Sequence, residues 1–500
     1  MNKRFFISFS ILEKISDKIL IIFLIFLCLI LRFIMLEHTY AINNDGIAYI
    51  YTAQKLWEGD FKNMFSCGGY KLGVIYSFTI AFFNTFIKNW ELSGNIASIF
   101  FSSFASIPLF KILRQFFSKT YAFFLCFIGI NLPYVIKQSV DVIRDTAYWF
   151  FLLFGIFFFL KTIQNSNKTY KFFLPAGLIS FLLAGINRVE GFWVAFMSLI
   201  FFILNQKNKK ISLYYFLISI FVIILSIFII WLFFPSIYEY LSIKFHINYG
   251  NNYKYYEKML TKLYISTYRD YWNYIKLLLP YIPFFIAILY YIKTSNVLSP
   301  FLIYGIYVSF KNNFRLFFIK YFLFLFFSYF LLLLFWCYSY TYLSKRYFFP
   351  LYLISLPLIG IGIKNFIEKF RYSLIKFIIL FLTIFILIVS ILDAIFSPRR
   401  KDEVVYKKIA FEINKIEKKH KDPLIIAGTN KKINFYINLN RKPSICALNL
   451  IHPVQFFKKC NADYLIFSKK EKNKYKKWLE TSEIKKIKEV DGWEIFKCKK

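Results

Sequence analysis

Residues 19–36 read ILIIFLIFLCLILRFIML, and residues 41–61 read AINNDGIAYIYTAQKLWEGDF. The first of these segments has the length and composition of one membrane-spanning helix. Basic residues precede it, and no small-residue cleavage site follows it. The pattern predicts an uncleaved first helix whose start lies in the cytoplasm, which places the polar loop at 37–71 outside the membrane.

The whole chain has the composition of a membrane protein. Of its 500 residues, 58% are apolar and 18% are charged, and its mean hydropathy is +0.51. A soluble protein carries about 25% charged residues, so soluble enzymes and disordered chains are excluded. The net charge of +37 does not indicate nucleic-acid binding, because basic residues lie mostly between apolar runs and in the last hundred residues. Such positions suit cytoplasmic loops and an anionic lipid surface.

Apolar runs and basic loops alternate along residues 1–397, which predicts an all-α polytopic membrane protein. We expect about 11 to 13 transmembrane helices from this alternation. One part of the chain does not fit this alternation. The loop at 37–71 is predicted outside and the basic turn near Arg114 inside, so an odd number of crossings must join them, yet two apolar stretches, 72–87 and 96–113, lie between. We expect 72–87 to be partly re-entrant or to lie along the surface. Outer segments are then expected at residues 37–71, 137–144, 187–191, 234–276 and 339–346.

The remaining segment, residues 398–500, is predicted to be a small α/β domain outside the membrane. Residues 402–419 have helical spacing, with an apolar stripe at Val405, Ile409, Ile413 and Ile416. A second helix is expected at 472–480. Short apolar runs predict strands at 424–427, 464–467 and 493–496. We expect this domain to be dispensable for chemistry and relevant to acceptor choice or stability.

Two clusters of charge at the outer ends of apolar runs are candidates for chemistry. Asp45 lies just past the first helix, with Tyr49 four residues on, in a segment whose spacing predicts an amphipathic helix on the membrane surface. The alternative is that Asp45 only caps that helix. Asp141, Arg144 and Asp145 lie at the entry to a later helix, where Asp141 and Asp145 would share one helical face. The alternative there is an Arg–Asp pair that anchors the helix end.

Outer basic residues run against the usual excess of positive charge in cytoplasmic loops. They are Lys71, Arg188 with Glu190 beside it, and the pair Lys345 and Arg346. Such cations suit a phosphate held at the outer leaflet. The sequence has no glycine-rich phosphate loop, no serine nucleophile elbow and no His/Cys metal spacing. A carboxylate acting as general base beside these cations fits sugar transfer from a lipid-phosphate donor.

In order and spacing, these motifs resemble the GT-C superfamily of polyprenyl-phosphate-sugar glycosyltransferases, in the glycosyltransferase family 39 branch. That branch includes protein O-mannosyltransferases and lipid A aminoarabinose transferases. The resemblance runs from about residue 20 to residue 362. Two positions depart from the family pattern: Gly46 replaces a second acidic residue, and Leu72 replaces a proline. The matching residues are Asp45, Tyr49, Gly59, Asp60, Lys71, Arg144, Asp145, Arg188, Glu190, Gly191, Arg346, Tyr347 and Pro350.

The resemblance implies an inverting glycosyltransferase of the bacterial inner membrane, with its N-terminus in the cytoplasm. Asp45 would be the catalytic base, and Lys71, Arg144 and Arg346 would hold the donor phosphate. Asp145 would orient Arg144 or the acceptor. Tyr49, Tyr347, Arg188 and Glu190 would complete the substrate site. The implied partners are a polyprenyl-phosphate-sugar donor, an unidentified acceptor and the lipid bilayer, and neither a metal nor another cofactor is expected.

Two other functions fit the same residues. Charges within a membrane also mark transport paths, so a transporter or flippase of lipid-linked sugars is the main alternative. Transporters usually contain internal repeats, and none is visible here. The third possibility is a non-catalytic assembly protein. The acceptor has no signature; the tyrosine-rich loop at 234–276 is a candidate for acceptor contact, and an interfacial aromatic belt is the alternative.

Overall fold

The computed structural model describes most of the chain in two compact units. The helical unit comprises Met1–Ile30, Phe101–Ile136 and Ala147–Ala394, and the mixed unit comprises Leu31–Phe100, Lys137–Thr146 and Ile395–Lys500. The described residues are 12–67, 73–164, 170–205, 281–311, 317–339, 343–369, 374–417, 424–428, 430–439, 462–469 and 484–498.

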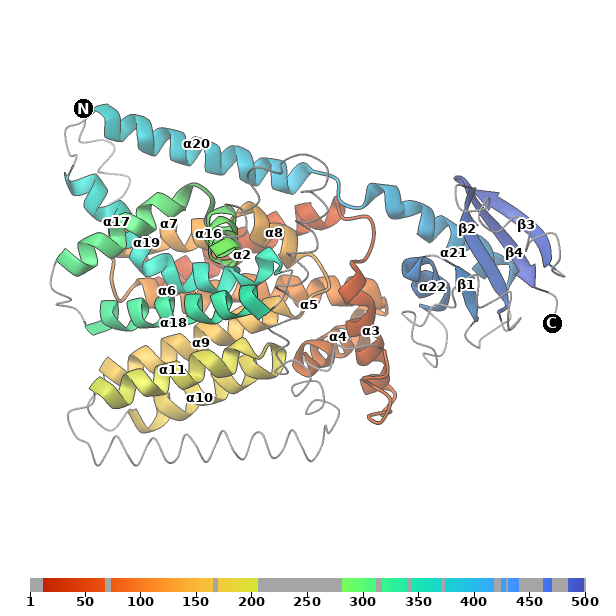
Figure 1. Cartoon of the computed structure of the whole chain (residues 1–500), viewed down its shortest axis with the longest axis horizontal. Coiled ribbons are helices and arrows are strands. Elements are labelled where there is room, and N and C mark those ends of the chain that lie inside the picture. The colour runs from red at the N-terminus through yellow and green to blue at the C-terminus, as the bar shows by residue number, and fades with distance from the viewer. Residues whose placement is uncertain are drawn as a thin grey trace, which may run out of the picture. The chain divides into compact units, whose positions relative to one another are not determined.

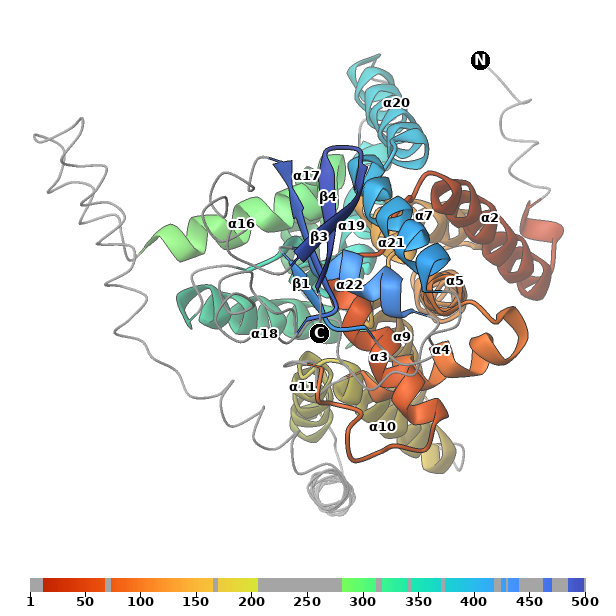
Figure 2. The same ribbon diagram turned by 90° about the vertical axis from the view of Figure 1, so that its right-hand side faces the viewer.

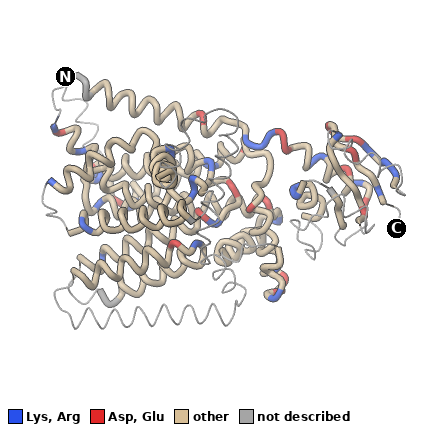
Figure 3. The backbone as a smooth tube through the Cα atoms, in the orientation of Figure 1, with Lys and Arg blue, Asp and Glu red and all other residues tan. Residues whose placement is uncertain are grey.

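Long apolar helices build the helical unit (Figure 1). In Figure 3 their charged residues are sparse along most of their length. The helices are α2 (Asp17–Glu37), α6 (Ser106–Leu113), α7 (Lys119–Ile130), α8 (Pro133–Ser139), α9 (Asp145–Gln164), α10 (Tyr170–Asn187), α11 (Glu190–Asn205), α16 (Ile282–Ser295), η3 (Asn296–Leu298), α17 (Ser299–Lys311), α18 (Phe317–Ser339), η4 (Lys345–Tyr347), α19 (Phe349–Lys369) and α20 (Leu374–Phe396).

The predicted polytopic helical class is confirmed. Among the described residues, seven helices are long and apolar enough to cross a membrane, or eight if the bent pair α7 and α8 is one span. Three shorter apolar helices add to these, at Val74–Ile87, Phe172–Asn187 and Glu190–Asn205. The total of about 11 to 13 spans stays a prediction, because residues 206–280 lie outside the described part. Helix breaks fall at three expected outer segments: 137–144, 187–191 and 339–346.

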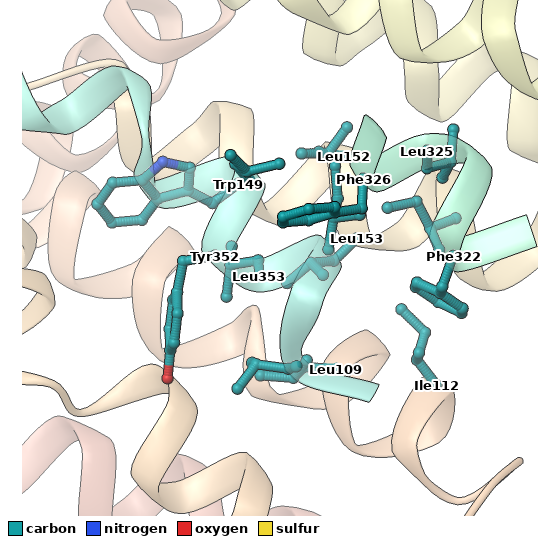
Figure 4. Packing of buried hydrophobic residues seen from close by; sticks show 14 of the residues in the cluster. Leu109, Ile112, Trp149, Leu152, Leu153, Phe322, Leu325, Phe326, Tyr352 and Leu353 are labelled. Carbon is teal, nitrogen blue, oxygen red and sulfur yellow. The ribbon is translucent and has the colours of Figure 1, made fainter. Parts of the chain in front are cut away.

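Apolar side chains from four helices fill the centre of the helical unit (Figure 4). Trp149 and Leu153 come from α9, Phe322 and Phe326 from α18, and Tyr352 from α19, with further residues from α6. The helices approach most closely between α17 and α19. A methyl group at Gly305 would overlap the carbonyl of Leu358, and one at Gly362 would overlap the carbonyl of Phe301. Small residues of this kind let membrane helices pack backbone to backbone.

The mixed unit combines three helices between residues 44 and 104 with the C-terminal domain (Figures 1 and 2). Its elements are α3 (Asn44–Trp57), α4 (Val74–Ile87), α5 (Trp90–Phe104), η5 (Lys401–Glu403), α21 (Val404–Ile416), β1 (Ile426–Gly428), α22 (Lys431–Asn438), β2 (Tyr464–Ser468), β3 (Ile484–Val490) and β4 (Trp493–Cys498). At 14 residues, α4 is about 21 Å long, which is short for a complete crossing. Its length is consistent with the re-entrant or surface placement expected of residues 72–87.

One four-stranded sheet, in the order β1-β2-β4-β3, forms the C-terminal domain. β1 and β2 are parallel, whereas β2, β4 and β3 pair antiparallel. Asp491 and Gly492 both have positive φ and form the tight turn between β3 and β4. Strands were predicted close to β1, β2 and β4, and a helix close to α21. β3 was missed because its sequence, IKKIKEV, is mostly charged, as suits an edge strand.

We expect Gly305→Ala to destabilise the helical unit, because the added methyl group meets a backbone carbonyl that cannot rotate away. Overpacking of this kind costs about 1–3 kcal/mol. The melting temperature of the purified protein in detergent is therefore expected to fall by several degrees. Gly177→Ala is the matched control, since a methyl group at that position in α10 meets its neighbours only at ordinary contact distances. Equal melting temperatures for the two variants would contradict the close packing of α17 on α19.

Candidate functional site

α3 carries Asp45 in its first turn. The N-cap is Asn43, so Asp45 does not cap the helix, and the capping alternative does not hold. The Asn43 side chain faces the segment 137–146, where its amide donates to the Val142 carbonyl at 3.1 Å and its oxygen accepts from the Val142 N–H at 3.0 Å. Asp45 is half-buried at the positive end of the helix, a place that favours negative charge.

We expected α3 to be one-sided and to lie on a membrane surface. The structure differs, because every residue from Gly46 to Lys55 is buried. Gly46 lies against Val142, and the Gln54 amide donates to the Leu439 carbonyl at 3.2 Å. The middle of the helix is therefore covered by other parts of the mixed unit on both of these sides, and the exposed residues, Asn44 and Trp57, lie at its two ends.

Tyr49 brings the predicted site residues of two distant segments together. Its ring centre lies 5.9 Å from the Arg144 guanidinium and 5.5 Å from the ring of Tyr76, edge to face. The Tyr76 hydroxyl shares a 2.6 Å hydrogen bond with Ser98, which fixes this neighbour. At Gly73, φ is +99° and a side chain would meet Arg144, so a glycine is needed there. Tyr49 follows Asp45 by one helical turn on the same face of α3.

Asp141 is an anchor and not a partner of Arg144. The Asp141 carboxylate is buried and accepts a 2.8 Å bond from each of Arg399 and Arg400. The sequence suggested one helical face for Asp141 and Asp145, and that prediction is wrong. Asp141 lies in the turn between α8 and α9, whereas Asp145 is buried as the first residue of α9. No sequence signal pointed to Arg399 and Arg400, since they resemble any basic pair at a membrane boundary.

A second cluster lies in the helical unit, where Arg188 and Glu190 form a buried ion pair. The Arg188 Nε and Nη2 atoms lie 3.1 and 2.5 Å from Glu190 Oε1. The same guanidinium stacks 4.2 Å from the ring centre of Tyr347 and 5.8 Å from that of Tyr148. Arg346 lies 5.8 Å from the Tyr347 ring. Three predicted site residues, Arg188, Glu190 and Arg346, thus gather around a fourth, Tyr347. Sequence reasoning missed Tyr148.

Not every matched residue is brought into a cluster. Lys71 and the loop at 234–276 lie outside the described residues. Asp60 pairs with Lys55 at 2.9 Å and accepts from Asn63 in the turn that ends α3. These hydrogen bonds lower the pKa of Asp60. Gly59 has φ at +74°, so Gly59 and Asp60 form the turn that closes α3.

Within the described ranges, no three His, Cys, Asp or Glu side chains are grouped to hold a metal ion. The expectation of a metal-free reaction stays a prediction. Cys67 forms a disulfide. Cys28, Cys126, Cys337 and Cys498 are not in a disulfide.

Gly46, where the family resemblance leads us to expect a second acidic residue, has no room for a side chain. A Cβ atom there would lie 2.8 Å from the Val142 Cβ and 2.8 Å from the Asn43 Oδ1. We expect Gly46→Asp to lower the melting temperature by several degrees and to reduce activity, because α3 must move away from Val142. The control is Asn44→Asp, which adds a carboxylate at an exposed neighbouring position. A Gly46→Asp variant with unchanged stability and activity would refute this close approach.

No protein-family model matches the sequence, and no curated protein matches it. Solved structures do resemble it. ArnT from Cupriavidus metallidurans bound to undecaprenyl phosphate is 9% identical at a TM-score of 0.65, over 96% of this chain and 98% of ArnT. The Archaeoglobus fulgidus oligosaccharyltransferase in complex with Zn and sulfate is 12% identical at 0.54, over 90% of this chain and 69% of its own.

AglB from Archaeoglobus fulgidus, in complex with an inhibitory peptide and a dolichol-phosphate, is 10% identical. Its TM-score is 0.53, over 90% of this chain and 70% of its own. At these identities the likeness concerns the fold. The chain therefore has the fold of the GT-C membrane glycosyltransferases, as its motifs predicted.

Proposed function

We propose that this protein is an inverting glycosyltransferase that transfers a sugar from a polyprenyl-phosphate donor to an acceptor on the outer side of the membrane. The observation that carries the proposal is the grouping of Asp45, Tyr49 and Arg144 within the mixed unit of a chain with this fold. Two structural neighbours were solved with undecaprenyl phosphate and dolichol-phosphate, and both ligands are polyprenyl phosphates.

In the proposed reaction, Asp45 accepts the proton of an acceptor hydroxyl or amine as that group attacks the anomeric carbon. The bond between the anomeric carbon and the donor phosphate breaks, and attack from the opposite face inverts the configuration. Polyprenyl phosphate leaves with the bonding electrons. Arg144 stabilises the charge that develops on the phosphate, because guanidinium groups bind phosphate oxygens in a fork. Asp145, buried next to Arg144 in the chain, keeps its proposed orienting role.

Arg188, Glu190, Arg346 and Tyr347 are proposed to contribute substrate contacts from the helical unit, and Lys71 a further cation. The Arg188 guanidinium bonds Glu190 and stacks on Tyr347, so its proposed role is to orient Tyr347 and Arg346. An arginine stacked on an aromatic ring is held in one plane, which leaves its neighbours a fixed surface. No metal is assigned a role. Transporters usually contain internal repeats, and none is visible in this sequence, which disfavours the transporter alternative.

The outer placement of the first loop is supported by the disulfide at Cys67. Disulfides persist in oxidising compartments such as the bacterial periplasm, and they are rare in the cytosol. We therefore propose that the loop at 37–71 lies outside the cytoplasm. The C-terminal domain belongs to the same compact unit as this loop, so we propose the same side for it.

Asp45→Asn tests the proposed base, because the amide cannot accept the proton. We expect kcat to fall by about 100- to 10,000-fold, the range that general base catalysis supplies, with little change in donor KM. Sugar transfer is measured in membranes with a radiolabelled polyprenyl-phosphate sugar. Asp60→Asn is the control, since that carboxylate lies in the same loop and only closes α3. Near-normal turnover by Asp45→Asn would remove Asp45 from its role, and movement of the lipid without transfer would favour the transporter.

Protease protection tests the proposed orientation. Protease added to intact spheroplasts is expected to remove the segment after about residue 397, because that segment lies outside a sealed membrane in the proposed topology. The fragments are resolved on reducing gels, since Cys67 carries a disulfide. A cytoplasmic marker protein should stay intact in the same sample. Full protection of the segment until detergent is added would invert the topology and the outer placement of Asp45.

A further inference from the structure

The chain that leads into Asp45 is held by residues of the C-terminal segment. We call residues 38–43 the entry segment. The Arg399 N–H donates to the His38 carbonyl at 2.8 Å, and the Tyr40 N–H donates to the Arg399 carbonyl at 3.1 Å. These two bonds form a short parallel bridge in which Thr39 pairs with Arg399. The entry segment thus takes its backbone direction from a residue more than 350 positions away.

Arg400 joins the entry segment to the segment that carries Arg144. Its Nη1 donates to the Ala41 carbonyl at 3.0 Å, and its Nη2 donates to Asp141 Oδ1 at 2.8 Å. Arg399 donates to the other oxygen of Asp141 at 2.8 Å. The two oxygens of one buried carboxylate therefore hold both arginines in fixed orientations. Charge-assisted bonds of this length are about twice as strong as neutral ones.

Tyr436 of α22 contacts the entry segment three residues before Asp45. Its hydroxyl accepts from the Ile42 N–H at 2.8 Å and donates to Glu91 Oε1 at 3.0 Å. Lys407 pairs with the second oxygen of Glu91 at 3.1 Å and lies 5.1 Å from the Tyr436 ring. Burial raises the pKa of Tyr436, so the hydroxyl keeps the proton that it donates. Ile42 precedes the N-cap of α3 by one residue.

We propose that Arg399, Arg400 and Tyr436 are positioning residues for sugar transfer, which set the place of Asp45 and Arg144 from the C-terminal domain. This inference rests on the proposed function. It replaces the expectation that the C-terminal domain is dispensable for chemistry. The physical reason is that α3 begins at Asn44, directly after the entry segment, so its first turn moves with Ile42. A misplacement of about 1 Å at a reacting group can cost 100-fold in rate.

Tyr436→Phe tests the proposal because it removes one hydroxyl and leaves the ring. We expect kcat to fall by about 10- to 100-fold with unchanged donor KM. The matched control is Tyr464→Phe, which removes a hydroxyl bonded to Glu417 at 2.6 Å in the sheet of the same domain, away from the entry segment. That variant is expected to keep its kcat. Arg400→Lys keeps the charge opposite Asp141 and is expected to lose less activity than Arg400→Gln.

A double-mutant cycle separates positioning from general damage. If Tyr436 acts through Asp45, then Tyr436→Phe should cause no further loss of kcat in an Asp45→Asn background. Independent, multiplied losses in the double variant would overturn the proposal. An inactive Asp45→Asn variant beside a fully active Tyr436→Phe variant would also overturn it, and would leave the proposed function intact.

Hydrogen exchange gives a readout that does not depend on activity. Peptides that cover residues 38–49 are expected to exchange faster in Tyr436→Phe than in wild type or Tyr464→Phe, because the Ile42 N–H loses its acceptor. The measurement uses the full-length protein in detergent and mass spectrometry of its peptides. Equal exchange in all three proteins would show that Tyr436 does not restrain the entry segment. Normal turnover by Asp45→Asn would reject Asp45 as the base. In that case hydrogen exchange would still test whether Tyr436 restrains the entry segment.

Discussion

The mixed unit depends on one buried carboxylate. Asp141 has two oxygens and two arginine partners, both from the C-terminal segment, and its backbone carbonyl accepts from Ser98 at 2.6 Å. A buried charge without partners is strongly unfavourable, so the arginines must stay where the carboxylate places them. Because Arg399 and Arg400 also bond the backbone of residues 38–41, this interaction connects three parts of the chain that carry the proposed chemistry.

Glycine positions set how closely those parts approach. Gly46 of α3 and Gly94 of α5 both lie against Val142, and a methyl group at either would lie 2.8 Å from a Val142 carbon atom. The Val142 side chain therefore lies between α3 and α5. In the sequence, Val142 directly follows Asp141 and precedes Arg144 by two residues. The same contact explains why a second acidic side chain is absent next to Asp45. At Gly46, α3 approaches Val142 closely, so Asp45 is the single carboxylate at this point of the helix and the proposed base.

The helical unit follows a different principle. There, Arg188 and Glu190 form a buried ion pair, and the guanidinium is stacked on Tyr347. In an apolar environment such a pair persists because each charge supplies the other's hydrogen bonds. Arg188 lies in the short turn between α10 and α11, and Glu190 is the first residue of α11, so the two apolar helices meet without leaving an isolated charge. Tyr347 and Arg346 are in this way held beside a rigid neighbour.

The sequence by itself determined the polytopic helical class, the presence of a helix at the position of α3, the breaks at 137–144 and 187–191, and three of the four strands. These features depend on local patterns of apolar and charged residues, which can be read along the chain. Only the tertiary structure decided that Asp141 binds Arg399 and Arg400, that residues 46–55 of α3 are buried, and that Tyr436 contacts Ile42. Such pairings join residues hundreds of positions apart. The strand β3 was also missed, because its lysine-rich sequence has no apolar pattern. Their positions follow from the packing of whole elements, which no local pattern contains.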